Sequence, residues 1–490
     1  MNSSIHRHRR RRAAGSRFPG RPVAWALLTL VAAPWPTVAE ERPTAETPPG
    51  GAPCRIEIVE RESGWPVPLV ELRTTHQARF VSDNAGVIAL DLPEAMGQET
   101  WFDVRGHGYG VAADGFGNRG VRLVPRPGAT LRVEVERSII ARRLGRLTGA
   151  GLFAEDERSG GGPRVAERRG VFGCDSVRVA THRGRLHWAW GDTTVPRYPL
   201  GVFDTTGATT GLAPLTAPVP PLALSFDMFV TDGARPRGIC PMPGSGPTWI
   251  GGLISLPDAS GTDRLVATYV KIRAALEPYE AGLCVWDDGA AVFRPHRLVW
   301  ARSDAAPLPP PLPDGHPVRY RDPAGGERVV FGDPLPTLEC AATFEAWENP
   351  AAWLALVPQP SIARRDGAAV VPHRGSIAWN GWRRRWITVF TEKFGSPSAL
   401  GEVWYAEAPA PTGPWAGAVK VLSHDNYSFY NPRIDAELTA ADGPVVLFEG
   451  TYSATFAADP VPTPRYDYNQ VLYRLDLDDP RLASDPSTGD

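Results

Sequence analysis

The chain has 490 residues, more than one ordinary domain, and 42% of them are hydrophobic, so it can bury a substantial core. Its 52 Lys and Arg are balanced by 54 Asp and Glu, which argues against a nucleic-acid partner because binders of nucleic acid normally show a basic excess. The 50 Gly and 51 Pro interrupt regular structure often, which predicts many short strands and few long helices.

Residues 1–39 have the pattern of an export signal. The positive stretch "RHRRRRAAGSRFPGR" precedes the apolar "VAWALLTLVAA" at 23–33, which is too short to span a bilayer, and small residues follow in "TVA" at 37–39. A membrane anchor is the alternative. Removal of the signal with its seven Arg leaves 45 basic and 54 acidic residues, a net charge of −9. We therefore expect a secreted or periplasmic protein without stable membrane insertion after cleavage.

Five cysteines are spread along the chain with no CxxC pair, at Cys54, Cys174, Cys240, Cys284 and Cys340. An exported protein with this number can form up to two disulfides, and the spacing does not predict their pairing. Zinc binding is not expected from this pattern.

Residues 40–52 are rich in Pro, Gly and Glu and are predicted to be a disordered linker. Residues 53–137 then show short segments with partial period-two alternation, such as "CRIEIVE" and "TLRVEVE", separated by turn residues. This pattern predicts a small antiparallel β-sandwich. Its "SDNAGVIAL" at 82–90 resembles the strand–turn–strand hallmark of prealbumin-like (carboxypeptidase regulatory-like) domains, which implies a fold and no particular chemistry.

A connecting helix and linker are predicted over 138–165, where "SIIARRLGRLTGAGLF" has apolar residues at helical spacing. Residues 166–482 return to strand, turn and strand, with hairpin turns at "HRGR", "DDGA" and "NGWRR". Repeated meanders over this length favour a five-bladed β-propeller, with a double-sheet jelly roll as the alternative. The predicted fold class is all-β, and 483–490 are expected to be a disordered tail.

In a propeller, side chains at the starts of the innermost strands point into a central funnel. Asp175 in "GCDS" precedes the first strand of the expected first blade, and Asp192 in "WAWGDTT" ends the next strand. One hairpin joins the two acids, so both are predicted to reach the funnel. For each, a turn-forming role is the alternative.

The region 171–482 resembles the five-bladed propeller glycosidases of the arabinanase, levansucrase and invertase type, and related exported propeller families. "GEVWYAEAPAPTGPW" at 401–415 is similar to a strand and turn that recur in such propellers. The resemblance implies a catalytic carboxylate at Asp175 and a Glu from a later blade, for which Glu402, Glu449 and Glu392 compete. It also implies a structural calcium, although no calcium-loop spacing is present; no other cofactor is expected.

Glycoside hydrolysis needs one carboxyl group that protonates the leaving oxygen and a second that activates water or attacks carbon. The acid needs a raised pKa, from burial or from a neighbouring carboxylate. We therefore expect Asp175 as base or nucleophile, Glu402 or Glu449 as acid, and Asp192 as a modulator.

Polar and aromatic residues are concentrated in "YSFYNPRID" at 427–435 and "TPRYDYNQ" at 463–470. Such a mixture is typical of a sugar cleft, because an apolar sugar face stacks on aromatic rings while polar groups bind hydroxyls. Sealing of contacts between blades is the alternative. The predicted substrate-binding residues are Trp190, Glu392, Tyr430, Asn431, Arg433, Arg465, Tyr466 and Asp467.

The sequence thus predicts an exported glycoside hydrolase that acts on an extracellular or periplasmic oligosaccharide or polysaccharide. A noncatalytic carbohydrate- or surface-binding propeller is one alternative. A polysaccharide lyase that uses Tyr and Arg is another.

Overall fold

The computed structural model describes residues 51–162, 170–215, 218–273, 276–458 and 461–483. The expected signal segment and nearly all of the expected linker and tail lie outside these residues. Within them the chain is almost entirely β, as predicted, with two short α-helices, α1 (Ala154–Arg158) and α2 (Phe344–Glu348). No helix in these ranges is long and apolar enough to cross a membrane. All five cysteines are buried, and no disulfide joins them in the part of the chain that the structure describes.

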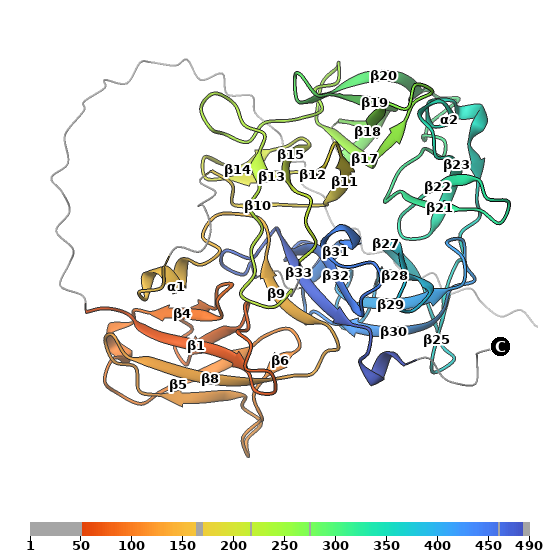
Figure 1. Cartoon of the computed structure of the whole chain (residues 1–490). Helices are drawn as coiled ribbons and strands as arrows, with labels where there is room; N and C mark the ends of the chain where they lie inside the picture. Colours follow the sequence, from red (N-terminus) through yellow and green to blue (C-terminus); the bar gives the residue numbers. More distant parts are fainter. Residues whose placement is uncertain (1–50, 163–169, 216–217, 274–275, 459–460, 484–490) are drawn as a thin grey trace, which may run out of the picture. The chain divides into compact units, whose positions relative to one another are not determined.

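The N-terminal part is a β-sandwich of two four-stranded sheets (Figure 1). Inward-facing residues such as Ile56, Leu72 and Phe102 are fully buried and form one apolar core, as the alternation predicts. The expectation of a purely antiparallel sandwich is wrong, because β1 and β8 pair in parallel. The sheets are β4 (Val87–Leu90), β1 (Cys54–Glu60), β8 (Thr130–Arg137) and β6 (Tyr109–Gly110), and β3 (Arg79–Val81), β2 (Glu71–Thr74), β5 (Thr100–Arg105) and β7 (Gly120–Leu123).

The predicted connecting helix is wrong over most of its length. Residues Arg142–Arg146 form strand β9, which pairs antiparallel with β33 (Asn469–Asp476). The spacing of Leu144 and Leu147 is compatible with a helix, but both side chains pack into the propeller core, and Gly145 has φ +145°, outside the helical region. Only α1, further along, is helical. Tertiary pairing has overridden the local helical pattern.

Five sheets follow one another along the chain as the blades of a propeller (Figure 1). Tight turns join their strands as predicted: at "HRGR", Arg183 and Gly184 have φ of 48° and 75°, the left-handed values that suit a two-residue hairpin. The jelly-roll alternative is wrong, because the sheets are separate. Blade 1 is β11 (Arg178–His182), β12 (Arg185–Trp190), β15 (Thr206–Gly211) and β16 (Asp227–Met228); blade 2 is β17 (Thr248–Pro257), β18 (Asp263–Arg273), β19 (Glu277–Asp287) and β20 (Val292–Ala301); blade 3 is β21 (Val318–Arg321), β22 (Glu327–Gly332), β23 (Pro336–Ala341) and β24 (Leu354–Ala355).

The last two blades complete the ring. Blade 4 is β27 (Pro372–Asn380), β28 (Arg385–Glu392), β29 (Val403–Ala408) and β30 (Ala416–Leu422), extended by β25 (Ile362–Arg364) and β26 (Ala369–Val370); blade 5 is β31 (Ser428–Ile434), β32 (Val445–Ser453), β33 and β9. The outermost strand of blade 5 therefore comes from the N-terminal side of blade 1, which fastens the ring. The five innermost strands line one axial channel of about 290 Å³.

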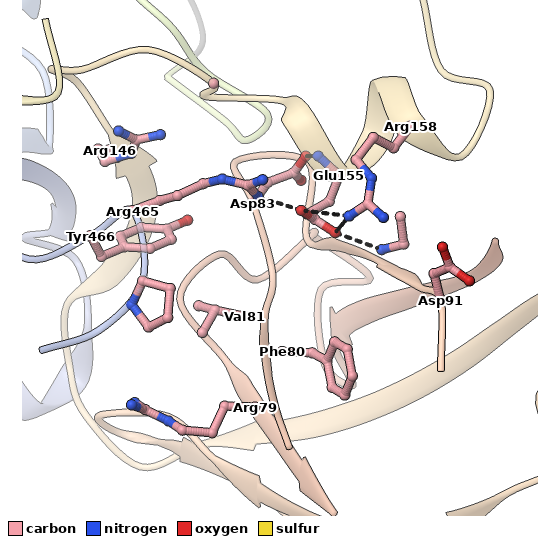
Figure 2. Close-up of a pocket in the computed structure, with 13 residues that line it drawn as sticks. Arg79, Phe80, Val81, Asp83, Asp91, Arg146, Glu155, Arg158, Arg465 and Tyr466 are labelled. Carbon is pink, nitrogen blue, oxygen red and sulfur yellow. Dashed lines mark hydrogen bonds and ion pairs between the residues drawn. The ribbon is translucent and has the colours of Figure 1, made fainter. Parts of the chain in front are cut away.

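The sandwich contacts the propeller through the predicted turn at 82–84. The side-chain amide of Asn84 donates to the Arg146 carbonyl at 2.8 Å and its oxygen accepts from the Arg146 amide at 2.9 Å. The Ser82 carbonyl accepts from the Tyr466 hydroxyl at 2.9 Å, and Asp83 accepts from two amides at the start of α1. Figure 2 shows Asp83, Arg146 and Tyr466 around a cavity of about 280 Å³ at this contact.

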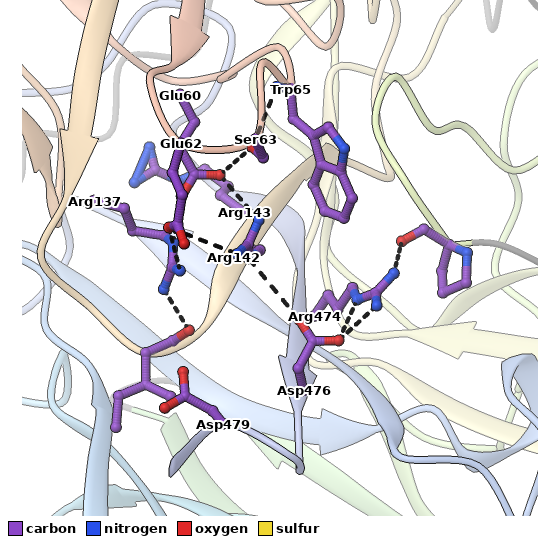
Figure 3. A network of polar contacts seen from close by, with 12 residues as sticks. Glu60, Glu62, Ser63, Trp65, Arg137, Arg142, Arg143, Arg474, Asp476 and Asp479 are labelled. Carbon is purple, nitrogen blue, oxygen red and sulfur yellow. Dashed lines mark hydrogen bonds and ion pairs between the residues drawn. The ribbon is translucent and has the colours of Figure 1, made fainter. Parts of the chain in front are cut away.

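A second set of contacts joins the sandwich to β9 and β33 (Figure 3). Buried Glu60 pairs with Arg137 at 2.7 Å and with Arg142 at 3.2 Å. The ring of Trp65 lies between two guanidinium groups, at 5.1 Å from Arg142 and 5.4 Å from Arg474. Because these charges are partly buried and paired, they fix the sandwich against blade 5 more firmly than exposed ion pairs would.

Candidate active site

Asp175 lies between β10 (Gly173–Cys174) and β11, at the start of the innermost strand of blade 1. The hairpin predicted from the sequence brings Asp192 beside it: the Asp175 amide donates to the Asp192 carbonyl at 3.1 Å, and the Gly191 amide donates to the Asp175 carbonyl at 2.8 Å. A Cβ at Gly191 would lie 2.2 Å from Asp175 Oδ1, so only glycine permits this close approach.

The carboxylate of Asp175 is held by three donors. Oδ1 accepts from the Asp192 amide at 2.8 Å, and Oδ2 accepts from the hydroxyls of Tyr468 at 2.8 Å and Tyr430 at 3.1 Å. Burial raises the pKa of Asp175, and the hydrogen bonds from Tyr468, Tyr430 and the Asp192 amide oppose this rise. These donors stabilise the anion of a partly buried carboxylate.

The carboxyl group of Asp192 has a different environment, with fewer hydrogen-bond donors. Burial, followed by the charges of Asp175 and Asp204, raises its pKa to about 7, against one hydrogen bond of 3.0 Å from Trp249 Nε1. Burial thus raises the pKa of both carboxyl groups, and the two differ in their donors: three hydrogen bonds favour the anion of Asp175, and one favours that of Asp192. Two neighbouring carboxyl groups with such different partners can act as an acid and a base in one site.

Strand β31 contributes two residues of the segment "YSFYNPRID" to the site, Tyr430 and Asn431. Asn431 has φ 51° and donates to Ser176 Oγ at 2.7 Å, while the Ser176 amide donates to Thr451 Oγ1 at 2.9 Å. The pairing of β31 with β32 shifts between Tyr430 and Arg433, which turns Tyr430 toward Asp175. Tyr430 and Asn431, both predicted to bind substrate, thus lie beside the predicted catalytic Asp175.

Aromatic rings border the site on two sides. The half-buried Trp249 meets Phe203 edge to face at 5.7 Å, and Tyr430 meets Phe456 at 5.8 Å. Phe203 and Phe456 are 41% and 60% exposed, which leaves apolar surface open to a ligand. Stacking of a sugar face requires such surfaces next to polar groups.

Charged residues continue the site toward blades 3 and 4. Arg178 lies near enough to Asp175 to lower its pKa, and its Nη2 is 3.9 Å from Asp333 Oδ2. Arg374 pairs with the same Asp333 oxygen at 3.1 Å. Each guanidinium group uses only some of its N–H donors on Asp333. The remaining N–H groups can donate to hydroxyl groups of a bound molecule.

Glu402 does not belong to this site. It was expected on an inner strand, but it precedes β29, the third strand of blade 4, where it is fully buried and bonded to Lys420 Nζ at 2.6 Å and Ser423 Oγ at 2.8 Å. Glu392, at the end of β28, accepts from Trp404 Nε1 at 3.1 Å. Both acids have structural partners within blade 4.

Glu449 lies on β32, opposite Arg433 of β31, and is 1% exposed. Burial and the charge of Asp435 raise its pKa well above the usual range. Arg433 itself pairs with Asp435 and Glu437, each at 2.5 Å, and faces the axial channel. This is a buried ion cluster whose Arg433 and Glu437 line the axial channel, and Glu449 is held within it next to Asp435 and Arg433.

The other predicted substrate-binding residues lie elsewhere. Trp190 is 1% exposed and stacks on Trp188 in the core, because β12 turns it away from the funnel. Arg465 pairs with Glu155 and Tyr466 with Ser82, both at the contact with the sandwich. Asp467 accepts from the Tyr427 hydroxyl at 2.7 Å and the Ala454 amide at 2.6 Å, so it holds a loop.

Two residues of the site were not singled out from the sequence. Trp249 is the second residue of an innermost strand, so the rule that selected Asp175 could have found it. Tyr468 lies two residues after the predicted Tyr466, and strict alternation would place both side chains on one side. Positive φ values at Arg465 (63°) and Tyr468 (59°) break that alternation and send the two rings to different partners.

The described ranges contain no group of three or more His, Cys, Asp or Glu side chains that could hold a metal ion. The calcium implied by the family resemblance thus has no such site in these ranges, and it stays a prediction. Asp175 accepts from tyrosine, and the neighbouring Asp192 and Asp204 accept from tryptophan and backbone donors.

No protein-family model and no curated protein matches the chain. Solved structures do match, all at low identity. An exo-β-1,3-galactanase from Phanerochaete chrysosporium is 8% identical with a TM-score of 0.37, covering 62% of this chain and 61% of its own. An exo-1,5-α-L-arabinanase from a bovine ruminal metagenomic library is 9% identical with a TM-score of 0.36, covering 61% and 92%. A Bacillus subtilis arabinanase is 10% identical with a TM-score of 0.32, covering 63% and 97%.

The matched structures include arabinanases, the type of propeller glycosidase that the sequence resembles. This chain spans only 61% of the galactanase's length.

Proposed function

We propose that this protein hydrolyses a glycosidic bond, with Asp175 as the ionised carboxylate and Asp192 as the proton donor. The observation that carries the proposal is the carboxyl pair itself: Asp175 accepts three hydrogen bonds, while Asp192 has a pKa of about 7 and one tryptophan donor. This assignment changes the expected role of Asp192 from modulator to acid, and it leaves out Glu402 and Glu449.

The two groups would act in sequence. Asp192, whose pKa is raised to about 7, gives its proton to the glycosidic oxygen as the bond to carbon breaks. Asp175, ionised and held by Tyr430 and Tyr468, either removes a proton from the attacking water or attacks the sugar carbon. In both cases the tyrosine hydroxyls keep the reacting carboxylate in one orientation.

A lyase is supported less well by the same contacts. A lyase needs a base strong enough to remove a proton next to a sugar carboxylate, and a tyrosine base requires a lowered pKa. Burial and the charge of Asp175 instead raise the pKa of Tyr430 and Tyr468 well above the usual range. The two arginines of the lyase alternative are paired with carboxylates: Arg433 with Asp435 beside the axial channel, and Arg465 with Glu155 at the contact with the sandwich.

We further propose that the substrate is a saccharide that stacks on Trp249 and Phe203, and that the protein meets it outside the cytoplasm. The exposed aromatic edges next to Asp192 support the first point, and the amino-terminal sequence pattern supports the second. We therefore propose a carbohydrate as the binding partner, and no nucleic acid.

The test is release of reducing sugar from plant, algal and bacterial polysaccharides by the purified chain and its Asp175→Asn variant. Asp287→Asn is the control, because Asp287 is a turn residue of blade 2 far along the chain from the site. Release by the wild type and the control, with a loss of at least about a thousandfold in Asp175→Asn, supports hydrolysis. Saccharide binding without release by any form would instead indicate a recognition protein.

A further inference from the structure

The segment Arg465–Gln470 contacts the sandwich at one end and the candidate active site at the other. Tyr466 donates its hydroxyl to the Ser82 carbonyl of the sandwich at 2.9 Å, and Arg465 pairs with Glu155, which also accepts from the Ala89 amide of β4. Two residues later, Tyr468 donates to Asp175 at 2.8 Å. A single short segment thus connects two domains through side chains that point in opposite directions.

The end of this segment also encloses the backbone that carries Asp175. Asn469 donates to the Phe172 carbonyl at 3.0 Å, and Gln470 donates to the Cys174 carbonyl at 3.1 Å. A Cβ at Gly173 would lie 2.3 Å from the Tyr468 carbonyl oxygen, so segment and strand are in direct contact. A shift of the segment would therefore move the residues on both sides of Cys174.

A parallel connection runs through β9. Asn84 binds both backbone groups of Arg146, and the Arg146 guanidinium lies 5.6 Å from the Tyr466 ring (Figure 2). Thr148, two residues on, donates to the side chain of Asn469 at 2.9 Å and accepts from the Gln470 amide at 3.1 Å. The turn at 82–84 thus holds the segment from two directions.

The backbone of the segment needs such support. Arg465 and Tyr468 both have φ near +60°, a conformation that residues with a side chain rarely adopt unless their surroundings impose it. The imposed contacts at Arg465 and Tyr466 come from the sandwich and α1, and those at Tyr468 come from Asp175. Loss of the contacts at Arg465 and Tyr466 would therefore release the contact between Tyr468 and Asp175.

We propose that the sandwich is a positioning element of the active site: the turn Ser82–Asn84 holds segment Arg465–Gln470, and this segment aims Tyr468 at Asp175. Residues Ser82, Asn84 and Tyr466 are positioning residues, because none touches the reacting carboxylates. The proposal rests on the proposed function for its kinetic consequence, but its structural consequence can be measured without any substrate.

The structural experiment compares amide hydrogen exchange in the full chain of the wild type, Tyr466→Phe and Asn84→Ala. Tyr109→Phe is the matched control: its hydroxyl also joins the sandwich to β9, accepting from the Arg143 amide at 3.1 Å, but it does not contact the segment. We expect exchange at the Asp192 amide, which donates to Asp175, to rise by about fivefold or more in the two test variants only. Equal exchange in all four proteins would overturn the proposal, whether or not the protein proves to be a hydrolase.

The kinetic experiment uses the substrate on which the wild type is active. Because Asp175 loses a donor when Tyr468 moves, its pKa should rise, and the acid limb of the kcat profile should move to higher pH in Tyr466→Phe. We expect kcat to fall about tenfold with KM within about twofold, and Tyr109→Phe to change only the thermal unfolding temperature. An unshifted acid limb in Tyr466→Phe would show a purely structural contact and reject the positioning role.

Discussion

The hydroxyl of Tyr468 donates to Oδ2 of Asp175 at 2.8 Å across 293 residues of sequence. The bond joins the loop before the last strand of the propeller to the first strand of its first blade. Tyr430, from blade 5, donates to the same oxygen at 3.1 Å. The carboxylate at the centre of the site is thus oriented by residues that come together only when the ring closes.

Removal of the Tyr468 hydroxyl should leave less of Asp175 in its ionised form. In Tyr468→Phe, Asp175 keeps the Tyr430 and Asp192 donors but loses its shortest tyrosine bond, so the pKa of Asp175 should rise. The acid limb of kcat/KM should move to higher pH, and kcat should fall roughly tenfold to a hundredfold. Tyr405→Phe, which removes a buried hydroxyl bonded to Glu407 in blade 4, should leave the profile unchanged. If kcat/KM of Tyr468→Phe depended on pH as in the wild type, Tyr468 would have no role in the ionisation of Asp175.

The alkaline limb of the pH–activity profile should reflect the ionisation of Asp192. Because the group must be protonated to act as an acid and its pKa is raised to about 7, activity should decline above roughly pH 7. Asp192→Asn should abolish this decline. It should also slow substrates with poor leaving groups much more than aryl glycosides with good ones, since the latter need little protonation. Equal losses on both substrates would argue that Asp192 is not the acid.

Asp192 should also make stability depend on pH in a defined direction. Its folded pKa is above the unfolded value of 3.8, so the unfolded chain loses this proton first, and the free energy of unfolding falls as pH rises from about 4 to 7. Asp192→Asn removes that effect. Its melting temperature, measured by calorimetry, should exceed that of the wild type at pH 8 and approach it at pH 4. A variant that is less stable than the wild type at pH 8 would contradict the raised pKa.

The sequence predicted the parts of the fold that depend on local pattern. Alternation and turn residues gave the sandwich strands and the hairpin that brings Asp192 to Asp175. Local pattern did not reveal β9, because its partner β33 lies more than 300 residues away and the apolar spacing at Leu144 and Leu147 also suits a helix. The strand is stable only as part of the closed ring.

Only part of the candidate site was predicted from the sequence, because local pattern does not show which strands become neighbours. Asp175 precedes β11 and Asp192 follows β12, so the hairpin between them predicts their approach, and Tyr430 and Asn431 lie in the innermost strand of blade 5. Glu402 was expected on an inner strand because "EVWYAEA" gives no sign that it is the third strand of its blade. Its ion pair with Lys420 depends on the neighbouring strand, which composition alone could not assign.

Glu402 should therefore matter for stability and not for catalysis. In Glu402→Gln the bond to Ser423 can persist, but the charge that pairs with Lys420 at 2.6 Å is lost within a buried environment. Since Lys420 is 34% exposed and can reach water, the free energy of unfolding should fall by only about 1–2 kcal/mol. Urea unfolding measures this loss, and kcat should stay within about twofold. A large fall in kcat with unchanged stability would return Glu402 to the list of candidate acids.

Closure of the ring by β9 gives a prediction about the whole molecule. Strand β9 supplies the outer hydrogen bonds of blade 5, and Leu144 and Leu147 fill its core, so a chain that begins at Thr148 exposes the edge of β33. Such a chain should lose cooperative unfolding or aggregate, whereas one that begins at Gly51 should unfold like the full protein. Calorimetry and size-exclusion chromatography distinguish these outcomes. A stable, monomeric chain from Thr148 onward would show that blade 5 needs no closing strand.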